Sequence, residues 1–141
     1  MNIAKIMVPK ALTVCMNATD SVRQGTEIMR RHGYTAIPVL DSEGRFLGCV
    51  NDRDFLRFIV TEENYSPERQ EQVTVGQIMR RDFCPPVPIT ASSGELIDAV
   101  LQQNFVPIVD DRGCLCGIVT RRLVIAGLVG RDLPAGGEFL E

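Results

Sequence analysis

The pattern of apolar and polar positions runs through the same series of elements twice. Residues 36–40 and 45–51 are apolar runs around a polar, glycine-containing turn, and residues 106–110 and 114–119 repeat this arrangement. Short apolar runs bounded by turn residues are typical of strands. Each pair of runs therefore predicts a β-hairpin.

A helix is predicted before each hairpin, because both segments open with the same polar signature. Ser21 is followed three residues later by Gln24, and Ser92 by Glu95, which is the spacing of a capping box. The first of these helices is expected to stop at Gly33, since glycine readily takes the left-handed conformation that ends a helix.

Three further elements complete the two copies. Residues 12–15 predict a short strand ahead of the first helix, and residues 52–60 and 121–129 predict helices that follow the hairpins. The predicted fold class is therefore α/β (α+β), with the order β-α-β-β-α in each copy.

The two copies also match residue by residue. Residues 37–51 align with residues 106–120 at a constant offset and share a proline, an aspartate, both glycines and a valine. An Ile-Met pair at residues 6–7 corresponds to one at residues 78–79 at a slightly larger offset, so the second copy lacks about one helical turn, which we assign to its first helix. One copy has few residues to cover its sheet, so the copies are expected to pack against each other with pseudo-twofold symmetry.

The repeat sets the predicted boundaries. The first copy is residues 1–61 and the second is residues 73–130. Residues 62–72 are polar and contain a proline, which is typical of a linker or of a fraying helix end. Residues 131–141 are expected to be an irregular tail.

Composition narrows the function classes. The chain has 141 residues, of which 45% are hydrophobic and 23% charged, and no apolar run approaches the ~18 residues that span a bilayer. The formal net charge of −3 argues against a nucleic-acid binder, which needs a basic surface. Five cysteines, an odd number without an evident secretion signal, indicate reduced thiols and a cytoplasmic location. We therefore expect neither membrane nor nucleic-acid partners.

The motifs resemble a known family. The pattern Gly-apolar-apolar-Thr/Ser-x-x-Asp, preceded by an apolar-Pro-apolar strand and by the Ile-Met pair, is similar to the cystathionine-β-synthase (CBS) domain pair over residues 3–129. The resemblance implies a regulatory module without catalytic activity that binds an adenosine-containing ligand such as AMP, ATP, S-adenosylmethionine or cyclic di-AMP.

Residues 33–41, 103–106 and 120–122 are, within the family, most similar to stand-alone CBS-pair proteins of Gram-positive bacteria that bind cyclic di-AMP. By this resemblance and by the chemistry of individual positions, a set of residues is predicted to surround the nucleotide. They are Lys10, Leu12, Tyr34, Thr35, Ala36, Ile37, Pro38, Asn51, Asp54, Val106, Thr120, Arg121 and Arg122.

Physical chemistry supports a phosphate site at the end of the second hairpin. Thr120 stands where a strand gives way to a helix, and the first N–H groups of a helix attract anions. Arg121 and Arg122 can add paired, charge-assisted hydrogen bonds to phosphate oxygens. Alternatively both arginines are solvated first-turn residues.

Asp54 follows the first hairpin where, by the resemblance, an aspartate accepts hydrogen bonds from both ribose hydroxyls. Alternatively it only stabilises the start of its helix. Asn51 replaces the usual Thr or Ser, and Leu123 replaces the second copy's aspartate, so that copy cannot hold a ribose in the usual way. An aspartate in this role also argues against cyclic di-AMP as the ligand. The 3′ oxygens of cyclic di-AMP are esterified, so it has no free ribose diol for Asp54 to bind.

Adenine recognition could come from the strands. Tyr34 can stack on or border the base, or it can be a partly buried core residue. Backbone groups of Ala36 and Val106, each next to a strand proline, could recognise the adenine edge.

An enzyme is not predicted, because the sequence offers neither a nucleophile with a base nor a carboxylate pair. The single histidine, His32, stands at a helix C-terminus, where it suits the dipole. Cys114 and Cys116 share one face of a strand and suggest a metal or redox sensor, although core packing is the simpler explanation. A third possibility is a ligand-independent dimerisation or interaction module. With no attached effector domain, a sensor of this kind is expected to form a homodimer and to signal to an unidentified effector protein by a ligand-dependent conformational change.

Overall fold

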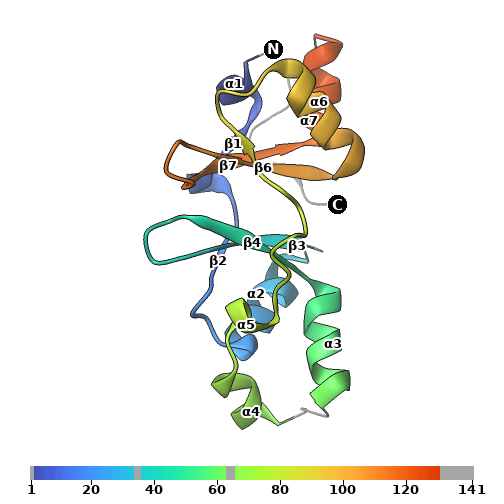
Figure 1. The fold of residues 1–141 in the computed structure, drawn as a ribbon. Helices are drawn as coiled ribbons and strands as arrows, with labels where there is room; N and C mark the ends of the chain where they lie inside the picture. The colour runs from blue at the N-terminus through green and yellow to red at the C-terminus, as the bar shows by residue number, and fades with distance from the viewer. Residues whose placement is uncertain (1, 34–35, 63–65, 131–141) are drawn as a thin grey trace. The chain divides into compact units, whose positions relative to one another are not determined.

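The computed structural model describes residues 2–33, 36–62 and 66–130. The chain divides into two compact units (Figure 1). Unit 1 combines Met1–Val14 with Cys84–Glu141, and unit 2 is Cys15–Phe83. The units therefore do not coincide with the sequence repeats, because the leading segment of each copy belongs to the unit that contains the hairpin of the other copy.

Unit 1 is built on a four-stranded sheet in the order β1-β7-β6-β5. The hairpin strands β6 (Phe105–Val109) and β7 (Leu115–Thr120) are antiparallel, β5 (Val87–Pro88) runs parallel to β6, and β1 (Val8–Pro9) pairs antiparallel with β7. A segment from the start of the chain thus forms the edge of the second copy's sheet.

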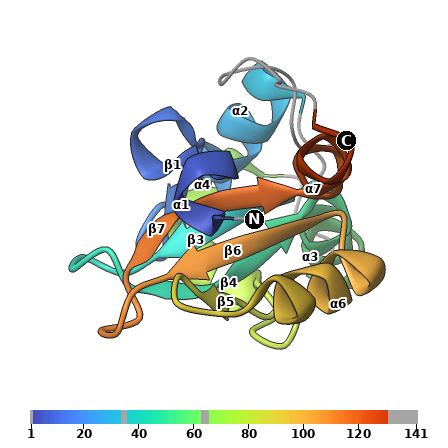
Figure 2. The ribbon, with the colours of Figure 1, turned by 90° about the horizontal axis from the view of Figure 1, so that it is seen from above.

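Three α-helices of unit 1 lie on one side of this sheet (Figures 1 and 2). They are α1 (Ile3–Ile6), α6 (Ser93–Gln102) and α7 (Arg121–Leu128). Their apolar faces meet the inner face of β6 and β7 in a core that includes Leu96, Val106, Ile108, Val119 and Val124. Because Leu96, Val106 and Val119 are fully buried, the hydrophobic effect holds helices and sheet together here.

Unit 2 has a three-stranded sheet in the order β2-β3-β4. Strand β2 (Met16–Asn17) is parallel to β3 (Ala36–Leu40), and β3 is antiparallel to β4 (Phe46–Asn51). All residues of β3 are buried. The helices of this unit are α2 (Val22–His32), α3 (Asp52–Glu62), α4 (Pro67–Gln72) and α5 (Val75–Ile78). The two sheets and their helices confirm the predicted mixed α/β fold class.

The predicted helix signals are confirmed. Ser21 and Gln24 form a capping box at the start of α2, and Ser92 and Glu95 form one at the start of α6. Gly33 ends α2 in the left-handed conformation, with φ of 66°. None of the described helices combines the length and hydropathy needed to cross a membrane.

The strand predicted at residues 12–15 is wrong. The chain forms β1 earlier, turns through a 3-10 helix, η1 (Lys10–Leu12), and reaches β2 only at Met16. The turn is closed by Thr13, whose backbone N–H donates to Lys10 O at 3.0 Å and whose hydroxyl donates to Pro9 O at 3.0 Å. Side-chain hydrogen bonds of this kind compete with extended structure.

Two other expectations change. The polar segment 62–72 is not only a linker, because Ser66 caps α4, which begins at Pro67 and packs against α2. Helix α6 has 10 residues against 11 in α2, so most of the shortening of the second copy lies outside its first helix. The predicted tail, residues 131–141, lies outside the described residues.

Candidate functional site

Helix α7 starts directly from β7 at Thr120. Its hydroxyl accepts a hydrogen bond from the N–H of Leu123 at 3.1 Å, and Thr120 itself pairs with Phe105 in the sheet. The residue is 3% exposed. Sheet pairing and capping together fix the position where α7 begins, as the sequence predicted.

Arg121 and Arg122 are exposed in the first turn of α7, which contains no acidic residue. The N–H of Arg121 donates to Asn104 O at 2.9 Å, and the Nε of Arg121 donates to Val100 O at 2.8 Å. Two of the first helical N–H groups, those of Arg121 and Leu123, are thus used inside unit 1. Anion binding at this end would rest on the guanidinium groups more than on the backbone.

Lys10 and Leu12 lie in η1, which contacts β7 in unit 1. Pro9, the residue before η1, pairs with Gly117, three residues before Thr120. Lys10 is exposed, and Leu12 is 53% exposed. These two side chains are available to a ligand along the same strand that leads to the arginines.

The predicted nucleotide-binding residues that lie on β3 and β6 have buried side chains. Val106 is fully buried in unit 1, and Ala36, Ile37 and Pro38 are buried on β3 of unit 2. Any contact they make with a ligand would use backbone atoms, which is how adenine recognition by Ala36 and Val106 was predicted. Tyr34 and Thr35 lie outside the described residues.

Asn51 and Asp54 begin α3 in unit 2, at the positions that correspond to Thr120 and Leu123. The N–H of Asn51 donates to Asp54 Oδ2 at 2.9 Å, and the N–H of Asp54 donates to Asn51 Oδ1 at 3.0 Å. Asp54 is fully buried. The asparagine that departs from the family pattern thus still serves as a cap.

Two arginines that the sequence analysis did not select also hold Asp54. Its Oδ1 lies 3.1 Å from Arg57 Nη2 and 3.3 Å from Arg80 Nε. Arg57 follows Asp54 by one helical turn, a spacing that could have been recognised in the sequence. Arg80 comes from the segment after α5, and only the tertiary fold brings it there.

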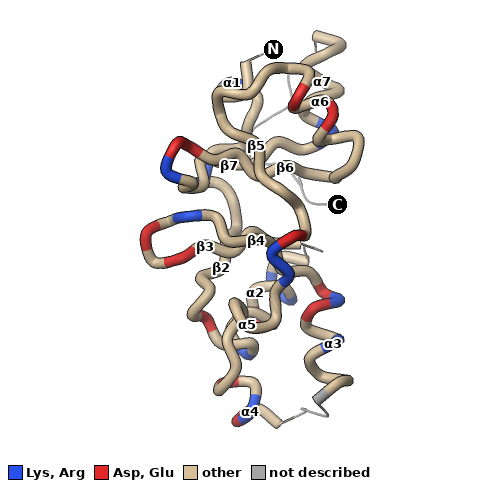
Figure 3. The backbone as a smooth tube through the Cα atoms, in the orientation of Figure 1, with Lys and Arg blue, Asp and Glu red and all other residues tan. Residues whose placement is uncertain are grey.

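The starts of the two equivalent helices therefore differ in charge. The first turn of α3 contains Asp52, Arg53 and Asp54, whereas the first turn of α7 contains no acid and two arginines. In Figure 3 the tube at the start of α3 carries both acidic and basic positions. An incoming phosphate is favoured at α7 over the acidic first turn of α3.

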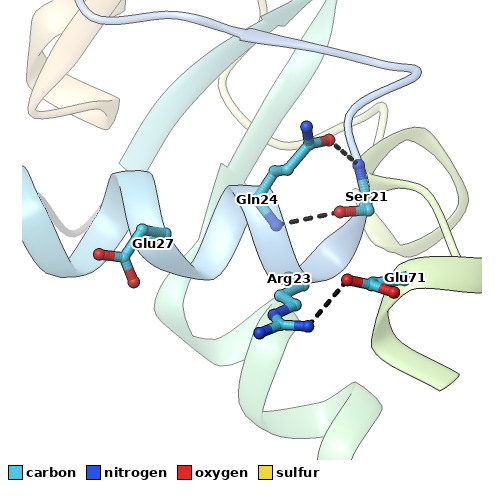
Figure 4. A pocket seen from close by; sticks show the side chains of 5 residues that line it. All are labelled: Ser21, Arg23, Gln24, Glu27 and Glu71. Carbon is cyan, nitrogen blue, oxygen red and sulfur yellow. Dashed lines mark hydrogen bonds and ion pairs between the residues drawn. The ribbon is translucent and has the colours of Figure 1, made fainter. Parts of the chain in front are cut away.

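An open pocket lies at the start of α2 in unit 2 (Figure 4). It is lined by Ser21, Arg23, Gln24, Glu27 and Glu71. Ser21 and Gln24 bond to each other as a cap, and Arg23 pairs with Glu71 at 2.8 Å. These interactions use the polar groups of Ser21, Gln24, Arg23 and Glu71, and the Arg23–Glu71 ion pair links α2 to α4. None of the predicted nucleotide-binding residues lines this pocket.

Cys114 and Cys116 are partly buried on the second hairpin. Burial raises the pKa of the Cys116 thiol, and the neighbouring Asp110 and Cys114 raise it further. A raised pKa lowers the thiolate fraction that metals and oxidants require. Within the described ranges, no group of three or more His, Cys, Asp or Glu side chains could hold a metal ion.

Comparison with known proteins places these features in a family. The model of the CBS domain matches residues 3–61 and 75–130, one match in each copy. Cyclic di-AMP receptor B of Bacillus subtilis (strain 168) is 32% identical over 101 residues, which cover 72% of this chain and 68% of that protein.

Solved structures agree on the fold. The crystal structure of CbpB in complex with c-di-AMP superposes with a TM-score of 0.85 at 14% identity, covering 92% of this chain and 85% of that one. The crystal structure of CBSX2 in complex with AMP gives a TM-score of 0.72 at 23% identity, covering 92% and 96%. With one matching copy in each half of its sequence, the chain belongs to the CBS domain family.

Proposed function

We propose that this protein is a non-catalytic receptor for an adenine nucleotide and that cyclic di-AMP is its ligand. The observation that carries the proposal is the absence of an available ribose acceptor at both described helix starts. Asp54 is fully buried and held by Asn51, Arg57 and Arg80, and the equivalent position in unit 1 is Leu123.

This feature separates the candidate ligands by their ribose chemistry. AMP and ATP each carry a free 2′,3′-diol, whose two hydroxyls are best accepted by one ionised carboxylate. Cyclic di-AMP has esterified 3′ oxygens and does not require such an acceptor. A carboxylate that already has three donors gains little from a diol, so the arrangement favours the cyclic dinucleotide.

The charge of unit 1 suits the phosphodiester groups of that ligand. Lys10, Arg121 and Arg122 are all exposed cations of unit 1. Phosphate contacts from arginine are short and charge-assisted. Similarity to a receptor for cyclic di-AMP supports the same choice. The backbone of Val106 in unit 1, and in unit 2 the backbone of Ala36 with Tyr34 and Thr35, are the proposed adenine contacts within their own units.

AMP or ATP is the second candidate ligand, because a structure of similar fold contains AMP. A ligand-independent interaction module is the alternative class. The exposed apolar side chains of α3 and α7 support this alternative, because they could bind a partner protein. The same side chains could also join two copies of the chain in a homodimer. In the receptor proposal, ligand binding in the cytoplasm alters affinity for an effector protein by the difference in ligand affinity between two conformations.

The test is a parallel titration of the purified chain with cyclic di-AMP, AMP, ADP, ATP and S-adenosylmethionine, followed by thermal unfolding and calorimetry. A ligand that binds only the native state raises the melting temperature. Selective stabilisation by cyclic di-AMP supports the proposal, and preferential stabilisation by AMP or ATP replaces it with the second candidate. No response to any nucleotide leaves the interaction module.

A further inference from the structure

The chain crosses from unit 2 to unit 1 between Phe83 and Cys84. Among the residues that the structure describes, Cys84 is the only one other than glycine with a positive φ, at 69°. This left-handed conformation is unfavourable for a residue with a side chain, and a residue before a proline favours extended backbone. The crossing therefore contains a strained backbone joint.

The strain is specific to this crossing. At the offset that aligns the two hairpins, Cys84 corresponds to Cys15, where the chain crosses from unit 1 to unit 2. Cys15 is followed by Met16 instead of a proline and is not in the left-handed region. It is also partly exposed, whereas Cys84 is buried. The repeat itself therefore does not require a left-handed residue at this position.

The side chain of Gln103 holds the strained joint. Its Nε2 lies 3.3 Å from Cys84 Sγ, 3.2 Å from the carbonyl oxygen of Pro85 and 3.3 Å from that of Phe105. The Cys84 thiol in turn donates to the Phe105 carbonyl at 3.4 Å. Gln103 is itself fixed as the C-cap of α6, where its N–H donates to Ala99 O at 3.0 Å. A strained conformation persists only where such surrounding contacts maintain it.

The same segment reaches the residues proposed to bind phosphate. Gln103 and Phe105 flank Asn104, whose carbonyl oxygen accepts the N–H of Arg121 at 2.9 Å. The strained joint is thus connected to the first turn of α7 through neighbouring residues and hydrogen bonds within unit 1. A shift of this segment would displace that turn, and by linkage a ligand held by the turn acts back on the joint.

We propose that Gln103 is a positioning residue that couples the nucleotide site of unit 1 to a strained hinge at Cys84. With the hinge held, the carbonyl group of Asn104 fixes the first turn of α7 for phosphate binding. With the hinge released, φ of Cys84 moves from 69° to about −120°, which redirects the chain where it crosses between the units. A ligand that binds the held state better shifts the population towards that state. This inference rests on the proposed nucleotide receptor and adds the route by which its ligand changes the conformation.

A double-mutant cycle with glycine tests the hinge. Gln103→Ala should weaken cyclic di-AMP binding about tenfold. Gln102→Ala is the matched control, since it removes the same side chain from the next, exposed position and should leave the affinity unchanged. Glycine takes a positive φ without a steric penalty, so in a Cys84→Gly background the Gln103→Ala change should cost less than about threefold. A residue that only packs against α6 is not rescued in this way, and an equal loss in both backgrounds overturns the hinge.

Alkylation of the wild-type chain by iodoacetamide measures hinge release without any substitution. The Cys84 thiol is 6% exposed, so its reaction requires local opening, and mass spectrometry of its peptide gives the rate. Saturating cyclic di-AMP should slow alkylation of Cys84 about fivefold or more. Cys49, which is fully buried in unit 2, is the internal control and should change less. Equal slowing at both thiols would indicate global stabilisation and would contradict a local hinge.

The hinge and the proposed function fail in different experiments. If cyclic di-AMP binds but neither the glycine cycle nor the protection of Cys84 responds, the receptor stands and the hinge is rejected. If no nucleotide binds the wild type, the proposed function fails and the coupling fails with it. The hinge is still tested in that case, because Gln103→Ala should speed alkylation of Cys84 about fivefold in the ligand-free chain and Gln102→Ala should not. Equal rates in these two variants reject the hinge.

Discussion

Asn51 and Asp54 cap each other, with the N–H of Asn51 2.9 Å from Asp54 Oδ2 and the N–H of Asp54 3.0 Å from Asn51 Oδ1. The equivalent pair in unit 1 keeps half of this arrangement, because Thr120 accepts from the N–H of Leu123 while Leu123 has no oxygen to return. The two equivalent helix starts therefore differ. In unit 2 the cap is a reciprocal pair that includes a buried aspartate, and in unit 1 Thr120 caps a helix whose first two residues are arginines.

Replacing Arg122 by alanine should weaken cyclic di-AMP binding about tenfold or more, because an exposed guanidinium contact to phosphate is lost. Arg122 is a better choice than Arg121, whose Nε supports the carbonyl group of Val100, so that its loss also destabilises α6. Calorimetric titration measures the affinity. Arg112→Ala is the control, since its side chain is 79% exposed in the same unit. An equal loss in the control indicates general charge attraction instead of a contact.

The variant Leu123→Asp should raise AMP affinity relative to cyclic di-AMP. The new carboxylate can accept the N–H of Thr120, as Asp54 accepts that of Asn51. The positions that correspond to Arg57 and Arg80 are Ala126 and Val8, so its second oxygen keeps capacity for a ribose diol. Competition calorimetry gives the ratio of affinities. Leu123→Asn, which has similar shape and no charge, controls for lost packing, and the same ratio in both variants would count against the ribose argument.

The sequence was sufficient for the local features of the fold. Ser21, Gln24 and Gly33 were recognisable as helix boundaries because capping depends on neighbouring residues. The strand expected at residues 12–15 failed because the hydroxyl of Thr13 closes a turn back to Pro9, which a hydrophobic pattern does not encode. The exchange of leading segments between the units is also non-local and could not be read from the repeat.

In the candidate site, too, the local features could be predicted from the sequence and the non-local contacts could not. Thr120 and the arginines after it were predictable, since a strand-to-helix junction with basic residues is a local pattern. The partners of Asp54 were not all predictable, because Arg80 reaches it across unit 2 from beyond α5. The sequence also could not show that Arg121 already donates two hydrogen bonds, from its Nε to the carbonyl of Val100 and from its backbone N–H to the carbonyl of Asn104.

Gly117→Ala should destabilise unit 1 by about 3 kcal/mol, because overpacking against backbone atoms forces strands apart. A β-carbon at residue 117 would lie 2.2 Å from the carbonyl oxygen of Val8, where β1 pairs with β7. Urea unfolding measures the loss. Gly94→Ala, on α6, is the matched control, since its β-carbon would meet nothing closer than 3.9 Å and alanine favours helix. Equal stability of the two variants would mean that β1 does not need this close approach.

The two hairpin turns should make stability fall in acid. The N–H of Arg45 holds the pKa of Asp41 below its usual value, and the N–H of Cys114 does the same for Asp110. A depressed folded pKa gives stability that is present above the unfolded pKa of about 3.9 and is lost as the pH falls through the folded value. Asp110→Asn should therefore differ from the wild type by a constant amount above about pH 4 and converge below it.

Urea unfolding at several pH values between 2.5 and 7 follows this convergence. The exposed Asp111→Asn, in the same turn, is the control. A gap between Asp110→Asn and the wild type that stays constant into acid would show that the turn carboxylate does not contribute through its charge.

Exposed apolar side chains on α3 and α7 predict how two copies of the chain associate. Leu56 and Val60 are each 61% exposed on α3. The corresponding residues are Ile125 on α7 and Val129, the C-cap of that helix, with 55% and 64% exposure. Residues four apart share one helix face, so each unit presents an apolar stripe. Because water contact of such stripes is unfavourable, we expect a homodimer that buries them.

The variants Leu56→Glu and Ile125→Glu should shift the chain towards monomer, measured by light scattering across a concentration series. Leu101→Glu, at a position 68% exposed on α6, introduces the same charge elsewhere and should leave the dimer intact. A monomeric wild type, or equal dissociation of all three variants, contradicts association through these helices. If a monomeric variant still binds its nucleotide, dimerisation and ligand binding are separable, and the interaction module alone cannot explain the protein.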